Sequence, residues 1–357
     1  MNGAYVIAEA GVNHNGSVDI AKELIRVAAE AGADAVKFQT FRAEKVASRR
    51  APKADYQMET TDGQESQIDM LRKLELPRAV HKELMAECRA AGIDFLSTPF
   101  EEESLDFLAG ECNLPVLKIP SGEITNGPFL LQVAKTGKDI ILSTGMSTLG
   151  EVENALGVLS FGYLHEGDPH SMRDFTDAYV EAQRKGILQG RVKLLHCTTE
   201  YPAPFDEINL AAMDTMRNAF GLPVGYSDHT EGIAVALAAV ARGASIIEKH
   251  FTLDRNLPGP DHKASLEPKE LGEMVRGIRQ IEQAIGGNIK TVGKAEEKNS
   301  LIARKSLVAR SFIREGERFT AENVTVKRPG TGISPLRYWD ILGTEAKRDY
   351  MADEVLL

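Results

Sequence analysis

The chain has few cysteines and no long apolar run. Its three cysteines among 357 residues, Cys88, Cys112 and Cys197, lie far apart and form no CxxC pair. A sparse, odd set argues against a disulfide framework or a thiolate zinc site and is typical of a reducing compartment. No stretch approaches the roughly 18 apolar residues of a membrane span. The first residues, MNGAYVIAEAG, also lack the basic region of a signal peptide. We therefore expect a cytoplasmic protein with no membrane partner.

An excess of positive charge is also missing. The chain has 42 Lys and Arg against 52 Asp and Glu, which gives a net charge of −10. A nucleic-acid partner is therefore not expected, because such proteins gather positive charge to meet phosphates. If the substrate is an anion, the few basic groups that bind it must be gathered locally against the overall sign.

Short apolar runs alternate with helical patterns over about the first 285 residues. Eight such units are the size and rhythm of a (β/α)8 barrel. An open doubly wound sheet is the alternative, but its Gly-rich nucleotide loop is missing, because the first turn reads GVNHNG rather than GxGxxG. The predicted strands are Tyr5–Ala8, Ala35–Gln39, Ile93–Leu96, Val116–Ile119, Ile140–Leu142, Val192–Leu195, Val224–Tyr226 and Ser245–Ile247.

Two segments break this rhythm. Glu44–Leu76 is polar and too long for an ordinary connection after a strand, and such loops are often functional lids. Phe161–Gly190 is also polar, and we expect it to be an insertion on the opposite side of the barrel with no catalytic role.

The composition changes after the last predicted helix. Residues 1–285 form the predicted barrel domain, residues 286–304 a charged linker, and residues 305–357 a small β-rich domain with Gly and Pro turns. Such a short domain without disulfide or metal has little core of its own. We expect it to lean on this barrel or on that of a partner subunit.

Two histidines follow neighbouring predicted strands near the end of the barrel. Val224–Tyr226 runs into Ser227-Asp228-His229, and Ser245–Ile247 runs into Glu248-Lys249-His250. The helical segment between them makes a βαβ unit, whose parallel strands lie side by side or nearly so. Two neutral imidazoles at one edge of a sheet are suited to hold a metal ion.

The other predicted strand ends are polar as well. Side chains at the carboxyl ends of barrel strands face a common mouth. Taken alone, each has a structural explanation, such as a snorkelling lysine, a hydrogen-bonded histidine or a helix cap, and we leave His196 out of the metal site for this reason. Together they offer two lysines and several hydroxyls for a phosphate or carboxylate. The set comprises Glu9, Lys37, Gln39, Thr98, Lys118, Ser121, Ser143, His196, Thr198, Ser227, Asp228, His229, Glu248 and His250.

Long motifs of this chain resemble the sialic acid synthase family. They are IAEAGVNHNG, AVKFQT, LSTPF, KIPSGEITN, ILSTGM, LLHCTTEYPAPF, VGYSDHTEG, IIEKHFTLD and PGPDHKASLEP, and they extend over nearly the whole chain. The tail, RKSLVAR followed by VKRPGTGISP, resembles the antifreeze-like (SAF) domain of the same family. At position 199 the chain has threonine where some members carry asparagine.

The resemblance implies a function. Members condense phosphoenolpyruvate with an N-acetylated mannose-type aminosugar and water to a nine-carbon 2-keto acid and phosphate. The acceptor N-acetylmannosamine, which gives N-acetylneuraminate, is the main expectation. The alternative is 2,4-diacetamido-2,4,6-trideoxymannose, which gives N,N'-diacetyllegionaminate. A metal-dependent aldolase, another phosphoenolpyruvate-condensing barrel or a carbohydrate-binding module remain more distant alternatives.

The resemblance also implies the roles of particular residues. A divalent ion, typically manganese with magnesium or cobalt as alternatives, is held by residues matching His229 and His250. The phosphoenolpyruvate contacts match Lys37, Thr98, Lys118, Ser121, Ser143 and Ser227. The sugar contacts match Gln39, Tyr201, Asp261 and Glu9, which is also the candidate proton-transfer residue. The family forms a domain-swapped homodimer, in which a residue matching Arg328 reaches the partner's sugar site.

Overall fold

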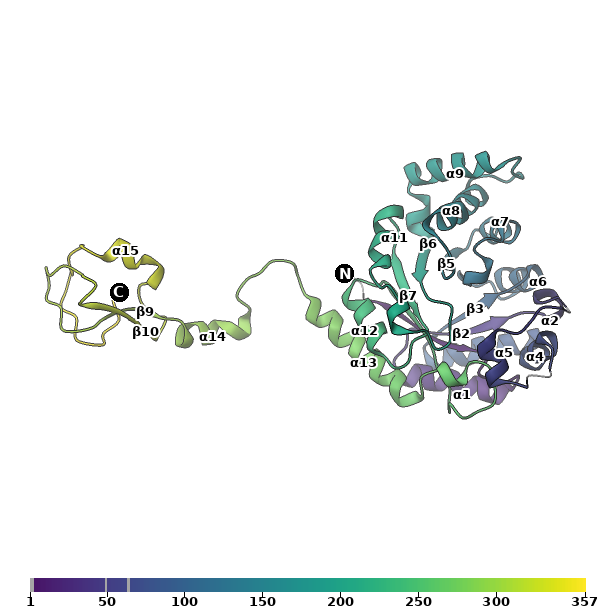
Figure 1. Ribbon diagram of the computed structural model, residues 1–357, viewed down its shortest axis with the longest axis horizontal. Coiled ribbons are helices and arrows are strands. Elements are labelled where there is room, and N and C mark those ends of the chain that lie inside the picture. The colour runs from purple at the N-terminus through teal and green to yellow at the C-terminus, as the bar shows by residue number, and fades with distance from the viewer. Residues whose placement is uncertain (1–2, 49, 63–64) are drawn as a thin grey trace. The chain divides into compact units, whose positions relative to one another are not determined.

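The protein is described by a computed structural model that covers residues 3–48, 50–62 and 65–357. The chain divides into two compact units, Met1–Gly286 and Gly287–Leu357. Figure 1 shows the elements of each unit. In the described residues, no helix is long and apolar enough to cross a membrane.

The first unit is a nearly closed barrel of eight parallel strands, so the predicted (β/α)8 fold is confirmed. The strands follow the order β3-β2-β1-β8-β7-β6-β5-β4, and the two end strands, β3 and β4, are also neighbours. Each predicted strand is present, with ends that differ by up to three residues. The strands are β1 Tyr5–Gly11, β2 Ala35–Thr40, β3 Asp94–Pro99, β4 Val116–Ile119, β5 Asp139–Ser143, β6 Val192–His196, β7 Val224–Asp228 and β8 Ile246–His250.

Helices surround this barrel, as Figure 1 shows. In α1, the Ser17 hydroxyl accepts a hydrogen bond from the Ile20 N–H and so caps the helix, which buries Leu24 and Ile25. The outer helices are α1 Val18–Glu30, α5 Arg78–Ala91, α6 Glu102–Asp106, α7 Gly127–Lys135, α8 Leu149–Leu164, α11 Ala212–Phe220, α12 Ala234–Ala241 and α13 Pro268–Ile285. Shorter turns are the π-helix η1 Phe107–Glu111 and the 3-10 helices η2 Ser121–Glu123, η3 Phe205–Glu207 and η4 His262–Ala264.

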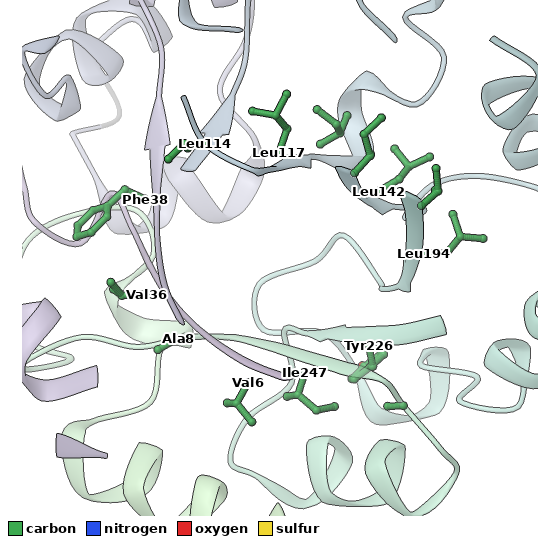
Figure 2. Packing of buried hydrophobic residues seen from close by; sticks show 14 of the residues in the cluster. Val6, Ala8, Val36, Phe38, Leu114, Leu117, Leu142, Leu194, Tyr226 and Ile247 are labelled. Atoms are coloured by element: carbon green, nitrogen blue, oxygen red, sulfur yellow. The ribbon is translucent and has the colours of Figure 1, made fainter. Parts of the chain in front are cut away.

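Alternation along the strands gives the barrel two cores. Successive side chains of a strand point to opposite faces, so Val6, Val36 and Ile247 pack outward against the helices. Figure 2 shows these residues among the outer core. The other face forms a separate inner cluster of Ile7, Ala35, Leu96, Ile141, Leu195 and Ile246. Gly225 has no side chain because an added Cβ would lie 2.8 Å from the Leu195 side chain inside this ring.

Both irregular segments contain helices. Glu44–Leu76 covers most of α2 Ala43–Val46 and all of α3 Asp55–Thr60 and α4 Gln67–Leu74, and its positions 49, 63 and 64 lie outside the described residues. Phe161–Gly190 contains the end of α8, then α9 Met172–Lys185 and most of α10 Ile187–Arg191. Helix α9 packs on α8 in the outer layer, away from the barrel interior (Figure 1).

The second unit has a small core of its own. Strands β9 Ser306–Ala309 and β10 Val324–Lys327 pair in an antiparallel sheet. Leu307, Ile313, Phe319 and Tyr350 are among the residues buried beneath it. The helices of this unit are α14 Lys294–Ala303, η5 Pro335–Arg337 and α15 Tyr338–Ile341. The segment predicted as a linker, residues 286–304, therefore contains the helix α14.

Candidate active site

A layer of polar side chains lies directly above the inner apolar ring. The strand period of two places Glu9 above Ile7, Lys37 above Ala35, and Glu248 above Ile246. These side chains line a cavity of about 300 Å³ at the carboxyl ends of the strands. Of the predicted site residues, the cavity brings together Glu9, Lys37, Gln39, Thr98, Lys118, Ser121, Ser143, Tyr201, Ser227, His229, His250 and Asp261. Their common position is what the barrel topology requires.

Two lysines and two glutamates form a buried charge network at the bottom of the cavity. Lys37 Nζ lies 2.7 Å from Glu9 Oε2 and 3.5 Å from Glu248 Oε2. Lys118 Nζ lies 3.2 Å from Glu248 Oε1. Lys37 also donates to Thr98 Oγ1, 3.1 Å away. Because the two carboxylates can balance the two ammonium groups, the network can persist without a ligand, and an anionic ligand would compete with the glutamates for the lysines.

The two glutamates differ in their tendency to ionise. Burial raises the pKa of Glu9, and the nearby carboxylate of Glu248 adds to this effect. Burial acts on Glu248 too, but Lys118 and Lys37 hold its pKa below the usual range. Glu248 is therefore the fixed counter-ion of the lysines, while Glu9 is the group suited to exchange a proton.

The histidine pair has the properties of metal ligands. The rings of His229 and His250 have centroids 5.8 Å apart, and burial lowers the pKa of each, to about 4 for His229. Both are therefore neutral at pH 7. His229 Nδ1 lies 2.6 Å from the Thr198 carbonyl and donates to it, which leaves Nε2 as an acceptor facing the cavity. A backbone carbonyl that fixes the tautomer in this way is common around ligating histidines.

The donors present fit a divalent ion. His250 Nδ1 is buried and has no hydrogen-bond partner among the described residues. Asp261 Oδ2 lies 3.9 Å from the same nitrogen, and burial raises the pKa of this carboxyl to about 6. Within the described ranges, no group of three or more His, Cys, Asp or Glu side chains is arranged around one point. The two imidazoles would therefore need water or substrate oxygens to complete an ion's coordination.

Small hydroxyl groups complete the opposite side of the cavity. Ser121 Oγ accepts a hydrogen bond from the Gly145 N–H at 2.9 Å. Ser143 Oγ is buried without a hydrogen-bond partner in the described part of the chain, so it can bind a ligand. Ser227 donates to Glu248 Oε1 at 2.8 Å and lies 3.4 Å from His229 Nε2, which links the charge network to the histidines.

Gln39 and Tyr201 each lie close to another predicted residue of the site. Gln39 Nε2 is 3.5 Å from Glu9 Oε1, and the Tyr201 hydroxyl is 3.2 Å from His229 Nε2. Thr199 also lines the cavity. Arg328 belongs to the second unit. Its side chain is exposed there, and its Nε donates to the Ala303 carbonyl.

Sequence reasoning left one central group without a role. Glu248 contacts both lysines and Ser227, yet it appeared only as one polar strand end among many. The signal for its importance is its place in the inward alternation Ile246, Glu248, His250. His196 was predicted among the side chains at the mouth, although not as a metal ligand, and it does not line the cavity. Its Nε2 lies 2.7 Å from the Ile208 carbonyl instead.

A barrel mouth with buried lysines beside paired neutral imidazoles defines an enzyme that acts on a small anionic substrate. Comparisons with known proteins refine this class. Residues 24–290 match the NeuB family, and residues 304–357 match the SAF domain. The chain belongs to the NeuB family. The predicted resemblance to sialic acid synthases with an antifreeze-like domain is thus confirmed.

Individual relatives point to nonulosonic acid synthesis. The chain is 52% identical over 356 residues to the N,N'-diacetyllegionaminic acid synthase of Campylobacter jejuni, covering 100% of this chain and 99% of that protein. It is 41% identical over 353 residues to the synthase of the same name from Legionella pneumophila, covering 99% and 93%. Among solved structures, the N-acetylneuraminic acid synthetase of Leptospira borgpetersenii, in complex with citrate, matches with a TM-score of 0.67 and 31% identity. That match covers 84% of this chain and 90% of the other. The relatives support the legionaminate alternative better than the N-acetylneuraminate expectation.

Proposed function

We propose that this nonulosonic acid synthase condenses phosphoenolpyruvate with 2,4-diacetamido-2,4,6-trideoxymannose and water, giving N,N'-diacetyllegionaminate and phosphate. The observation that carries the reaction class is the position of Lys37 and Lys118 in one cavity with the neutral pair His229 and His250. The acceptor follows the 52% identity to the Campylobacter jejuni enzyme over the whole chain.

The lysine side of the cavity suits phosphoenolpyruvate. This substrate carries a phosphate and a carboxylate, which need cationic and hydroxyl donors in a buried site. Lys37 and Lys118 supply the charge, and Thr98, Ser121, Ser143 and Ser227 supply hydroxyls. The Ser143 hydroxyl has no hydrogen-bond partner among the residues that the structure describes, so it is available to donate to the ligand. Binding would draw the lysines from the glutamates, and the raised pKa of Glu9 lets this carboxyl take up a proton and leave the cavity less negative.

The histidine side suits the sugar aldehyde. His229 and His250 would hold a divalent ion, for which manganese is our expectation and magnesium or cobalt are alternatives. When bound, such an ion supplies Lewis acidity, which polarises a carbonyl group. Gln39, Tyr201 and Asp261 border this side and would orient the open-chain sugar through hydrogen bonds. Positioning the two reactants can lower the barrier by about 7–11 kcal/mol.

The reaction forms one carbon–carbon bond and one carbon–oxygen bond, the latter to the oxygen of water, and it breaks the carbon–oxygen bond to phosphate. Carbon 3 of phosphoenolpyruvate attacks the aldehyde carbon of the sugar, and positive charge develops at carbon 2. Water adds to carbon 2 and loses one proton, which balances the proton taken up at the aldehyde oxygen. Phosphate then leaves from carbon 2 with the second water proton, and this carbon becomes the keto group. The aldehyde oxygen gains a proton and becomes a hydroxyl. We assign this proton transfer to Glu9, because its pKa is raised by burial and its carboxyl is next to Gln39 on the sugar side.

The proposal includes a homodimer in which Arg328 serves the partner's site. Support comes from the exposure of Arg328 and from the SAF match over residues 304–357. The resemblance to the sialic acid synthase family implies that this arginine contacts the N-acetyl group of the sugar.

A two-sugar assay tests the proposed function. The purified full-length protein is incubated with phosphoenolpyruvate, Mn²⁺ and either the diacetamido sugar or N-acetylmannosamine, and phosphate release is followed. We expect release that requires a sugar and is faster, in kcat/KM, with the diacetamido sugar. Higher kcat/KM with N-acetylmannosamine would restore the N-acetylneuraminate assignment. If phosphate is released with neither of the two sugars, both acceptor assignments are rejected.

A further inference from the structure

The cavity has a second face that the charged residues do not explain. Six apolar side chains, Val12, Val46, Met70, Leu71, Leu74 and Phe100, line it together with the strand-end groups. We call these six residues the apolar wall. None of them belongs to a barrel strand. Val12 follows β1, Val46 ends α2, Phe100 follows β3, and the other three lie on α4.

The apolar wall is a packed structure. Val12, Met70 and Leu74 are buried with Phe41, and Leu71 and Phe100 pack against them in a cluster separate from the barrel cores. The Phe41 and Phe100 rings meet edge to face, with centroids 6.1 Å apart. Val46 is 38% exposed, although a valine side chain gains free energy when it is buried. The wall is therefore held in place by packing and still offers apolar surface to a ligand.

The cavity is thus strongly asymmetric. Its floor carries two lysines, two glutamates and two histidines, whereas the apolar wall carries no charge. Among the described residues of the same segment, Gln57 and Gln67 are the polar groups that line the cavity. A sugar hydroxyl in contact with the six side chains of the apolar wall would lose hydration, and these side chains offer it no hydrogen bond, which is costly. A methyl group in the same place would be removed from water at a gain.

We propose that the apolar wall receives the C6 methyl group of the acceptor and thereby selects 6-deoxy sugars over sugars with a 6-hydroxyl. This inference rests on the proposed function. That function fixes the aldehyde carbon near His229 and His250, where it meets the enolpyruvate. Carbon 6 is the opposite end of the open chain, so it extends away from the charged floor and toward the loop residues that form the wall.

Two polar substitutions of nearly unchanged shape test the inference. Val46→Thr adds a hydroxyl at an exposed rim position, and Leu71→Asn places an amide within the wall. The probe sugars are N-acetylmannosamine and its 6-deoxy analogue, which differ only at C6. Hydrophobic pockets discriminate one such group by roughly 10- to 200-fold. We expect wild type to prefer the 6-deoxy sugar. The ratio of kcat/KM with the 6-deoxy sugar to kcat/KM with N-acetylmannosamine should fall by about tenfold in Leu71→Asn and by less in Val46→Thr.

A matched control and defined outcomes complete the test. Val180→Thr makes the same change at a valine that is 43% exposed on α9, away from the cavity, and should leave the ratio unchanged. Thermal unfolding shows whether each variant is folded. If Leu71→Asn does not fold, Val46→Thr still tests the inference. An unchanged ratio in the folded variants of the apolar wall would overturn this inference and leave the proposed function intact. If wild type releases phosphate with neither probe sugar nor the diacetamido sugar, the proposed function fails, and the inference fails with it.

Discussion

The Lys249 ammonium lies 2.9 Å from Asp228 Oδ2, and both side chains are fully shielded from solvent. The same ammonium donates to the Thr230 carbonyl, and Asp228 Oδ1 accepts from the Thr230 N–H at 2.9 Å. This pair joins the ends of β7 and β8 on the outer face of the barrel. Since His229 and His250 are the next residues along the chain, the pair fixes the backbone from which both histidines project.

Removing one partner of this pair should destabilise the barrel strongly. Lys249→Met leaves the Asp228 carboxylate buried without a counter-ion, so we expect the free energy of unfolding to fall by about 3–5 kcal/mol. Urea denaturation measures the change. As a control, Lys185→Met breaks the exposed pair with Glu181, which solvent screens, and should lower the free energy of unfolding far less. Equal losses in the two variants would show that Lys249 has no special structural role.

The strand pattern predicted much of this site, but not the Lys249–Asp228 pair. The polar residues that follow apolar strands were visible in the sequence, and the barrel topology was sufficient to bring them together. Which neighbours of His229 and His250 face inward depends on strand phase. Asp228 was predicted to lie at the mouth with Glu248, but its side chain does not line the cavity and pairs instead with Lys249. The helices within Glu44–Leu76 were missed because their apolar residues pack against loop residues far apart in the sequence. The apolar wall was missed with them.

Glu9 should be required for turnover more than for binding. Glu9→Gln keeps the shape of the side chain but cannot transfer a proton, so kcat should fall by roughly 10²- to 10⁴-fold. The KM for phosphoenolpyruvate should change much less. Steady-state kinetics of phosphate release measure both constants. Exposed Glu23→Gln is the control and should retain wild-type kinetics. A full kcat in Glu9→Gln with both substrates saturating would remove Glu9 from the proton transfer.

The histidine pair should bind a divalent ion in the absence of substrates. Chelator treatment should abolish phosphate release, and added Mn²⁺ should restore it. Titration calorimetry with Mn²⁺ should show weaker binding in His229→Gln and His250→Gln, because each loses an imidazole ligand. His196→Gln changes a histidine that bonds to the Ile208 carbonyl outside the cavity, so its Mn²⁺ affinity should match wild type. Unchanged affinity in both pair variants would place the ion elsewhere.

Acid should destabilise the fold partly through His14. Burial lowers the pKa of His14 from its ordinary value of 6.5 to about 4. Between these values the unfolded chain binds a proton that the folded chain does not, so the free energy of unfolding falls as the pH falls. Above the ordinary value neither state binds the proton, and this contribution to the pH dependence vanishes. From pH 7 to pH 5, His14 alone should account for a loss of about 2 kcal/mol.

His14→Asn removes this titration and isolates its effect. Its stability at pH 7 will be lower, because the imidazole Nδ1 accepts a hydrogen bond from the Gly16 N–H. Its further loss on going from pH 7 to pH 5 should nevertheless be about 2 kcal/mol smaller than in wild type, as measured by urea denaturation at both values. His170→Asn makes the same substitution at an exposed imidazole and is the matched control. The same loss in His14→Asn as in wild type would contradict the prediction.

Arg328 offers a direct test of a shared active site. If it acts in the partner's cavity, as we propose, Arg328→Ala and Glu9→Gln inactivate different halves of each composite site. Each variant alone should release little phosphate. Mixed and allowed to exchange subunits, they should form heterodimers in which one of the two sites has both residues intact, and activity should recover to about a quarter of the wild-type level. Sites that each belong to a single chain would give no recovery, because every cavity would then lack one of the two residues. Co-expressing the variants with different affinity tags isolates the heterodimer and distinguishes a failure of exchange from a failure of complementation.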